Sequence, residues 1–155
     1  MSRAFVKEPD GLEAFDELPE KLVSDHRNLV TARGLELIEA EVARWSADHA
    51  TAQAANDRAA IARAQRDLRY WAQRRSTAEV MAPPDGAKTV QFGSTVSLVR
   101  DDGRHQKFNI TGEDEADPAK GSISYVSPLA QALLGKATGD TVLAGAGEAE
   151  ITAII

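Results

Sequence analysis

Side chains that could carry chemistry are few in this chain, and their spacing limits what each could do. The three histidines, at positions 26, 49 and 105, lie in three separate segments. None has a carboxylate or a second histidine at the spacing that places zinc ligands on one helix, which argues against a metal-dependent hydrolase. Cysteine is absent, so disulfides and thiolate metal sites are excluded as well.

Carboxylates gather in the run Glu113–Asp117, which has the chemistry to hold a hard cation such as Ca²⁺. The run lacks the alternating acids and the glycine of a calcium loop, so we interpret these side chains as solvated loop acids. Ser127 has no histidine near it in the sequence and directly precedes Pro128, which favours a helix cap over a nucleophile. Gly135-Lys136 lacks the upstream glycines and the following helix of a phosphate-binding loop.

The composition limits the partners that this chain could bind. The 155 residues carry a net charge of −6, so bulk electrostatics does not favour binding to a nucleic acid backbone. No apolar run approaches the ~18 residues that span a membrane, and residues 1–11 lack the apolar core of a secretory signal. We therefore expect a cytoplasmic protein that does not bind membranes.

Residues 1–30 differ from the rest of the chain because they show no sustained apolar period. Pro9, Gly11 and Pro19 interrupt them, which predicts an extended tail with one short helical turn near residues 11–17. A poorly ordered tail and a tail that docks on a neighbouring surface are both open. The apolar side chains that could dock are Phe5, Leu12, Phe15 and Leu18.

A helical hairpin is predicted over residues 31–80 by two apolar seams with alternating steps of three and four. The first seam follows Thr31, a suitable N-cap, and the second follows Asp57, another suitable N-cap. Asn56 tolerates the left-handed backbone that ends a helix, so we place the tip near residues 53–57. One long helix is the alternative. The two seams are Leu35, Ile38, Val42 and Trp45, and then Ile61, Ala64, Leu68, Trp71, Arg75 and Ala78.

Charge differs between the two predicted helices. The first is mainly acidic and the second is rich in arginine, so we expect opposite charges on facing helices to set the orientation of the hairpin. The arginine face could also meet nucleic acid, but the acids of the first helix favour pairing between the helices. Near the tip, Asp48 is interpreted as an exposed charge and Asp57 as a cap.

A small β-domain is predicted after the arm. Pro83 and Pro84 end the helical pattern, and residues 81–89 form a linker. The apolar period then changes to two, with hairpin turns at 101–103 and 145–147 and one short helix that begins at Ser127. The expected fold is therefore α+β: an N-terminal antiparallel helical hairpin, or coiled coil, followed by an antiparallel sheet of four to five strands with one short helix.

Residues 90–155 resemble the C-terminal domain of the GreA/GreB transcription elongation factors. The resemblance is carried by FNITGEDEAD at 108–117, by ISYVSPLAQALLGK at 123–136, and by the Gly139-Asp140 pair that follows. Upstream, TARG at 31–34 resembles the start of the family's arm, and SRAFVKE near the N-terminus is similar to GreB.

The resemblance implies an FKBP-like domain at 90–155 that binds RNA polymerase at the rim of its secondary channel, while the coiled coil enters the channel. The docking corner of the family falls on Ser127, Pro128 and Leu129. Acids at the family's tip help to hold a second Mg²⁺ at the polymerase's own active site, and Asp48 and Asp57 are the possible tip acids here. The resemblance thus implies a monomer with no catalytic residue, metal or cofactor of its own, which meets nucleic acid only through the elongation complex.

The tip of the arm departs from the pattern of cleavage-competent members. Their D-L-x-E-N-A-E-Y motif falls over residues 47–54, ADHATAQA, where only Asp48 is acidic, and the hairpin is shorter. Val126 also replaces a residue that is often polar or acidic in the family. We therefore expect an elongation regulator with a short arm, as in Rnk-like relatives.

Two alternatives remain open. One is stimulation of transcript cleavage, with Asp48 and Asp57 as substitute tip acids. The other is a peptide-binding or prolyl isomerase module, which the FKBP-like fold alone suggests, although fold does not determine function. The domain's aromatic side chains, which a prolyl pocket would need, are Phe92, Phe108 and Tyr125.

Overall fold

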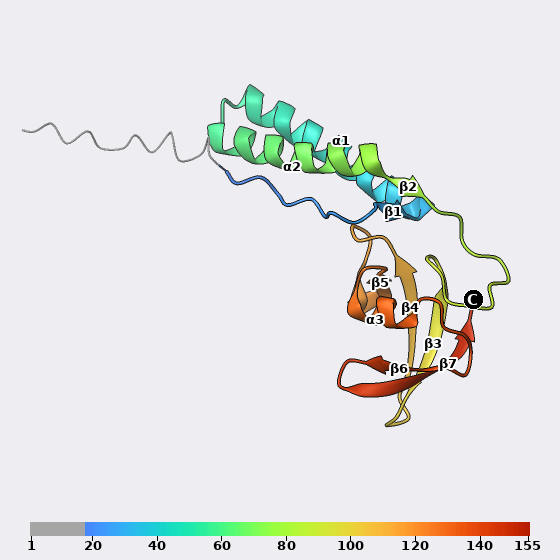
Figure 1. Cartoon of the computed structure of the whole chain (residues 1–155). Helices are drawn as coiled ribbons and strands as arrows, with labels where there is room; N and C mark the ends of the chain where they lie inside the picture. Colours follow the sequence, from blue (N-terminus) through green and yellow to red (C-terminus); the bar gives the residue numbers. More distant parts are fainter. Residues whose placement is uncertain (1–17) are drawn as a thin grey trace, which may run out of the picture.

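The computed structural model describes residues 18–155. It consists of a helical arm and a β-domain, with the chain from residue 18 onward running extended beside the arm (Figure 1). The predicted helical turn near residues 11–17 and the side chains of Phe5, Leu12 and Phe15 lie outside the described residues. Within the described part, no helix is both long enough and apolar enough to cross a membrane.

An antiparallel helical hairpin forms the arm, as the two apolar seams predict. Helix α1 spans Ala32–Ala54 and helix α2 spans Arg58–Thr77. In the turn between them Asn56 has φ 52°, a left-handed conformation that asparagine adopts more readily than most residues. Asp57 then caps α2, because its Oδ1 accepts a hydrogen bond from the backbone nitrogen of Ala60 at 3.1 Å. One long helix is therefore wrong, and the tip lies within the predicted range.

The two helices bury their seams unequally. On α1 the predicted position Ile38 is fully buried. On α2 the buried residues are Ala64, Asp67 and Arg74, whereas Arg75, which its spacing places on the seam, is exposed. This part of the prediction is wrong because α2 packs against α1 on one side and against the N-terminal segment and the β-domain on another.

A two-stranded parallel sheet closes the base of the hairpin. Strand β1 (Leu29–Val30) enters the arm and strand β2 (Glu79–Val80) leaves it. The backbone nitrogen of Glu79 donates to the carbonyl of Asn28 at 2.8 Å, and that of Met81 donates to Val30 at 2.8 Å. The entrance and exit of the arm are thus held together by backbone hydrogen bonds.

Five strands make the sheet of the β-domain, in the order β5-β4-β3-β7-β6. Their bounds are Thr95–Arg100 for β3, His105–Thr111 for β4, Ser122–Ser124 for β5, Thr141–Ala144 for β6 and Gly147–Ile154 for β7. All neighbours are antiparallel except β4 and β5, which are parallel, so the antiparallel prediction is wrong for this pair. The chain between them crosses over through the acidic run and a short 3-10 helix, Pro118–Lys120. The predicted α+β class is confirmed.

Helix α3 (Pro128–Leu133) packs on the sheet and completes the core of the β-domain. Leu98, Ile110, Leu133 and Ile151 are fully buried there. Truncating a core side chain of this size to alanine costs about 2–5 kcal/mol, because the lost contacts are only partly replaced. The domain therefore has a core of its own. Because α3 packs on this core, the positions of its exposed residues are fixed relative to the sheet.

Candidate functional site at the hairpin tip and the domain corner

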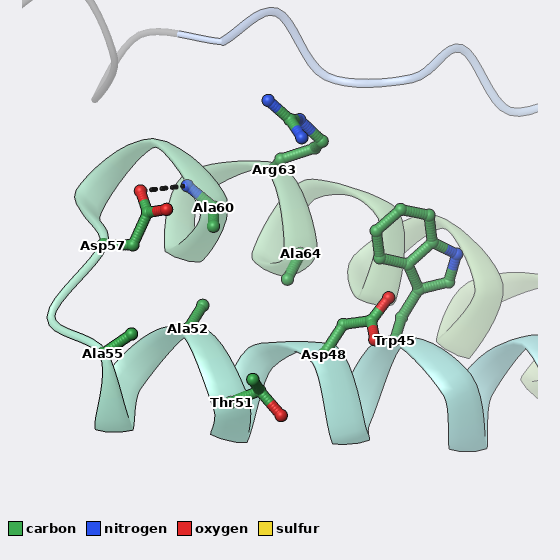
Figure 2. Close-up of a pocket in the computed structure, with 9 residues that line it drawn as sticks. All are labelled: Trp45, Asp48, Thr51, Ala52, Ala55, Asp57, Ala60, Arg63 and Ala64. Atoms are coloured by element: carbon green, nitrogen blue, oxygen red, sulfur yellow. Dashed lines mark hydrogen bonds between the residues drawn. The ribbon is translucent and has the colours of Figure 1, made fainter.

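The tip of the arm holds a cavity between the two helices (Figure 2). Its volume is about 270 Å³. Four of its nine lining residues are alanines, whose side chains are too small to fill the space between two helices. The lining residues are Trp45, Asp48, Thr51, Ala52, Ala55, Asp57, Ala60, Arg63 and Ala64. The hairpin is therefore closely packed at Ile38 but hollow at its tip.

Both predicted tip acids line this cavity, and they do so from opposite helices (Figure 2). Asp48 lies on α1 beside Trp45 and points into the space between the helices. Asp57 lies at the start of α2, where one carboxylate oxygen caps Ala60. Arg63 also contributes to the lining, but its guanidinium points away from the two carboxylates and out of the space between the helices. The two carboxylates thus line one cavity but lie apart within it, Asp57 at the turn and Asp48 beside Trp45 (Figure 2).

These two carboxylates do not make a metal centre by themselves. Among residues 18–155, no three histidine, aspartate or glutamate side chains gather in a way that could hold a metal ion. Hard cations take six or more oxygen ligands, so a cation at the tip needs most of its ligands from another molecule. His49, on α1 near the tip, has a buried Nε2 without a hydrogen-bond partner, as a packed histidine would.

The predicted docking corner at Ser127, Pro128 and Leu129 forms the start of helix α3. Ser127 caps α3, as predicted, because its Oγ accepts a hydrogen bond from the backbone nitrogen of Ala130 at 3.3 Å. Pro128 occupies the first helical turn and is exposed, while Leu129 packs partly against the core. The corner therefore presents an exposed proline at the start of a capped helix that packs against the core. The docking role of this corner stays a prediction.

A buried ionic cluster joins the arm to the β-domain. The Arg74 guanidinium of α2 is 2% exposed and donates to Asp114 Oδ2 at 2.6 Å and to Asn28 Oδ1 at 2.6 Å. The carboxylate of Glu113 lies 3.5 Å from the same guanidinium. The hydroxyl of Tyr70 donates to Asp114 Oδ1 at 2.8 Å. Burial raises the pKa of Tyr70 to about 12, and its bond to Asp114 acts in the same direction. We call these five residues the Arg74 clasp.

The acidic run is part of this junction, so its interpretation as solvated loop acids is wrong. Besides the clasp, Glu115 accepts a hydrogen bond from Thr31 Oγ1 at 2.9 Å and one from the backbone nitrogen of Gly112 at 3.1 Å. A Cβ on Gly34 would lie 1.6 Å from Glu115 Oε2. The spacing of Thr31 and Gly34 in the TARG motif therefore has a structural reason: one caps α1 and binds Glu115, and the other leaves room for it.

The predicted charge pairing between the two helices is also wrong. Among residues 18–155, no arginine of α2 pairs with an acid of α1. Arg69 pairs instead with Glu20 of the N-terminal segment, and Arg66 pairs with Asp67 of its own helix. Arg69 and Arg74 thus hold α2 to the N-terminal segment and to the β-domain, rather than to α1.

Aromatic side chains of the β-domain are engaged in packing. Phe108 and Tyr125 pack against the core, and Phe92 meets Tyr125 edge to face with ring centroids 5.5 Å apart. The hydroxyl of Tyr125 donates to the backbone carbonyl of Arg27. These contacts do not favour the alternative of a prolyl isomerase, which needs aromatic rings turned toward a peptide.

Known proteins are similar to this chain over stretches of different length. Residues 84–155 match the family model described as "Transcription elongation factor, GreA/GreB, C-term". The chain is 36% identical over 135 residues to the transcription elongation factor GreA of Desulfovibrio desulfuricans, which covers 85% of this chain and 79% of that protein. The chain belongs to the GreA/GreB family. The resemblance seen in the motifs at 108–117 and 123–136 is thereby confirmed.

Other GreA/GreB relatives align over less of their length. The transcription elongation factor GreB of Neisseria meningitidis is 42% identical over 80 residues, and the chain spans only 49% of that protein. Among solved structures, GreA factor homolog 1 (Gfh1) of Thermus thermophilus matches with 18% identity and a TM-score of 0.41, covering 84% of this chain and 99% of that one. A GreA/GreB protein of Nitrosomonas europaea matches with 21% identity and a TM-score of 0.41, covering 82% and 98%.

Proposed function

We propose that this GreA/GreB family member regulates transcription elongation by binding RNA polymerase at its secondary channel. The β-domain docks through the corner at Ser127, Pro128 and Leu129, and the arm enters the channel tip first. The observation that carries the proposal is the family match over residues 84–155, which includes this exposed corner. The protein works as a monomer in the cytoplasm and meets nucleic acid only within the elongation complex.

The junction between arm and domain supports separate roles, in which the β-domain docks and the arm enters the channel. The Arg74 clasp and the Thr31–Glu115 hydrogen bond connect the base of the arm to the acidic run of the β-domain. A docked domain would therefore aim the arm in one direction, and the tip would reach a defined place. Such positioning is what a factor needs if it acts at a site that belongs to its partner.

The chain is not an enzyme in this proposal, because the catalytic metal belongs to the polymerase. Its main effect is to occupy the channel and to compete with factors that have longer arms. Stimulation of transcript cleavage is the second candidate, and the position of Asp48 and Asp57 around one cavity favours it. In that case the two carboxylates would add ligands to a second Mg²⁺ shared with the polymerase, whose role is to stabilise the attacking and leaving oxygens.

Binding is tested by capturing core RNA polymerase on the immobilised full chain in rising salt. The wild type retains the polymerase, and Pro128→Glu loses it because a charge is placed at the centre of the docking corner. The matched control is Pro118→Glu, since Pro118 is also an exposed proline at the start of a short helix of the same domain. Failure of the wild type to bind, or equal loss in both variants, contradicts the docking proposal.

The effect on cleavage is tested in a backtracked elongation complex with a radiolabelled transcript. Asp57→Asn and Asp48→Asn remove the tip charges, and asparagine at position 57 keeps the helix cap. If the protein competes for the channel, both variants slow cleavage by a longer Gre factor as well as the wild type does. If the protein stimulates cleavage, the wild type shortens the transcript and the two variants do not.

A further inference from the structure

The two carboxylates at the tip have no cation paired with them in the described part of the chain. Among residues 18–155, no basic nitrogen lies within 4.0 Å of a carboxylate oxygen of Asp48 or Asp57. Arg63 lines the same cavity, but its guanidinium points out of the space between the helices (Figure 2). The chain from residue 18 runs on the side of α2 away from α1 (Figure 1). Within residues 18–155, the two negative charges of the cavity are therefore not compensated by an ion pair.

These two charges lie at different ends of the cavity. Asp57 lies at the turn, and Asp48 lies beside Trp45 on the side toward the base of the arm (Figure 2). Asp48 precedes Ala54, the last residue of α1, by six positions, or about 9 Å along the helix axis, and Asp57 lies beyond that end. The walls between the carboxylates carry the methyl groups of Ala52, Ala60 and Ala64 (Figure 2). The cavity is thus an apolar space with a carboxylate at each end.

This arrangement determines which kind of cation fits in the isolated protein. A hard metal ion takes six or more oxygen ligands around one point, whereas the cavity offers two separated carboxylates and alanine methyl groups. An ion with a single positive charge would leave one carboxylate without a partner. The complementary molecule carries a positive charge at each end and has an apolar middle, which describes an alkyl diammonium ion.

The dimensions of the cavity agree with a short diamine. The compound 1,4-diaminobutane has as many non-hydrogen atoms as benzene, which a cavity of about 150 Å³ accommodates, and the tip cavity measures about 270 Å³. Ordinary bond lengths place the two nitrogens of the extended diamine about 6 Å apart. A charge-assisted hydrogen bond adds about 3 Å at each end. The diamine can therefore reach two carboxylates that are roughly 10–12 Å apart.

The indole of Trp45 favours a cation at the Asp48 end of the cavity. Aromatic rings attract ammonium and guanidinium groups that lie within about 6 Å of the ring centroid. This ring already has the Arg44 guanidinium 4.7 Å from its centroid. Arg44 is itself paired with Glu41 at 3.2 Å, so its charge is balanced and opposes a second cation only weakly. An ammonium group at this end would therefore meet a carboxylate and an aromatic ring.

We propose that the tip cavity binds a short alkyl diammonium ion, such as 1,4-diaminobutane, with one nitrogen at Asp48 and the other at Asp57. The bound ion neutralises both tip acids and fills the space between the alanines. Its affinity falls as the salt concentration rises, because exposed ion pairs are screened by salt. This site goes beyond the function proposed above and does not depend on it, because binding is a property of the isolated protein.

Fluorescence of the full chain tests the chemistry of the ligand. In a Trp71→Phe background the remaining indole is Trp45, so its emission reports on the cavity. The protein is titrated with 1,4-diaminobutane, n-butylamine and magnesium chloride at equal ionic strength. We expect the diamine to bind about fivefold more tightly than butylamine, because only the diamine pairs with both carboxylates. Equal affinity for the two amines, or the same change in emission with Mg²⁺, would overturn the proposal.

Charge variants test the two ends of the site. Asp48→Asn and Asp57→Asn should each reduce the affinity for the diamine to that for butylamine, and asparagine at position 57 keeps the helix cap. Glu39→Gln is the matched control, because Glu39 is an exposed acid of the same arm that does not line the cavity. Equal weakening in all three variants would mean that the diamine responds only to the net charge of the arm, which contradicts a defined site.

The position of the ligand is tested by filling the cavity and by nuclear magnetic resonance. Ala60→Leu occupies the space while leaving both acids in place, so it should abolish diamine binding in a variant whose helix content circular dichroism shows to be unchanged. In the unaltered chain, the backbone amide of Ala60 donates to Asp57 Oδ1, and its resonance should shift when the diamine is added. Full binding by folded Ala60→Leu, or an Ala60 amide that does not shift, would place the diamine elsewhere and refute the site.

Discussion

Replacing Arg74 by methionine removes the charge at the centre of the clasp while keeping much of the side chain's volume. The guanidinium is 2% exposed and the Asp114 side chain 9%, so water cannot readily replace either partner. The substitution would leave Asp114 and Glu113 side by side without a cation. Breaking a buried ion pair by removing one partner costs about 3–5 kcal/mol, because the other charge stays buried and uncompensated.

Urea unfolding followed by circular dichroism measures this loss, and small-angle X-ray scattering of the same variant reports whether the arm keeps its position. Arg75→Met is the matched control, since Arg75 is the next residue on α2 and is exposed. A surface change of this kind usually alters stability by no more than about 0.5 kcal/mol. Adding Asp114→Asn to Arg74→Met should recover part of the stability, because it removes one uncompensated charge. A loss below about 1 kcal/mol in Arg74→Met would refute the reasoning.

Three further predictions concern the junction and the N-terminal segment. Gly34→Ala should destabilise the protein by about 1–3 kcal/mol in urea unfolding, because the added methyl displaces Glu115; a gain in stability would mean that helix propensity outweighs this contact. Burial acts to raise the pKa of Asp67, but hydrogen bonds from Lys21 and Arg66 outweigh it and lower the pKa below 3.8. The contribution of Asp67 to stability is thus present above pH 3.8 and lost as the pH falls further, and Asp67→Asn should flatten the acid limb of the stability profile. The raised pKa of Tyr70, about 12 against 10, means that its contribution is complete below pH 10 and is lost as the pH rises toward 12; tyrosinate absorbance of wild type and Tyr70→Phe should show this late titration.

Local features of this fold could be predicted from the sequence. Asp57 caps a nitrogen three residues away, and Asn56 sets its own backbone conformation, so each needs only its neighbours to be interpreted. Ser127 and Pro128 define the start of α3 in the same way. The pattern of a helical arm followed by a β-domain follows from these signals and from the change of apolar period.

Long-range contacts could not be predicted in the same way. Arg74 and Asp114 are 40 residues apart, and each has the appearance of an ordinary surface charge until the fold brings them together. The glycine at position 34 was a signal for this junction, because a helix interior rarely benefits from glycine unless another group approaches closely. The tip cavity had a weaker signal in the alanines on both sides of the turn, which cannot fill the space between helices.

The parallel β1–β2 pair has a consequence for how this arm can vary in length. Because the strands tie the two ends of the hairpin together, its base does not depend on how far the helices continue beyond it. Inserting or deleting seven residues in each helix moves the tip by about 10.5 Å and nearly restores the facing of the seams. The length of the arm can therefore change by whole heptads while the β1–β2 pairing and the contacts between the arm and the β-domain stay the same.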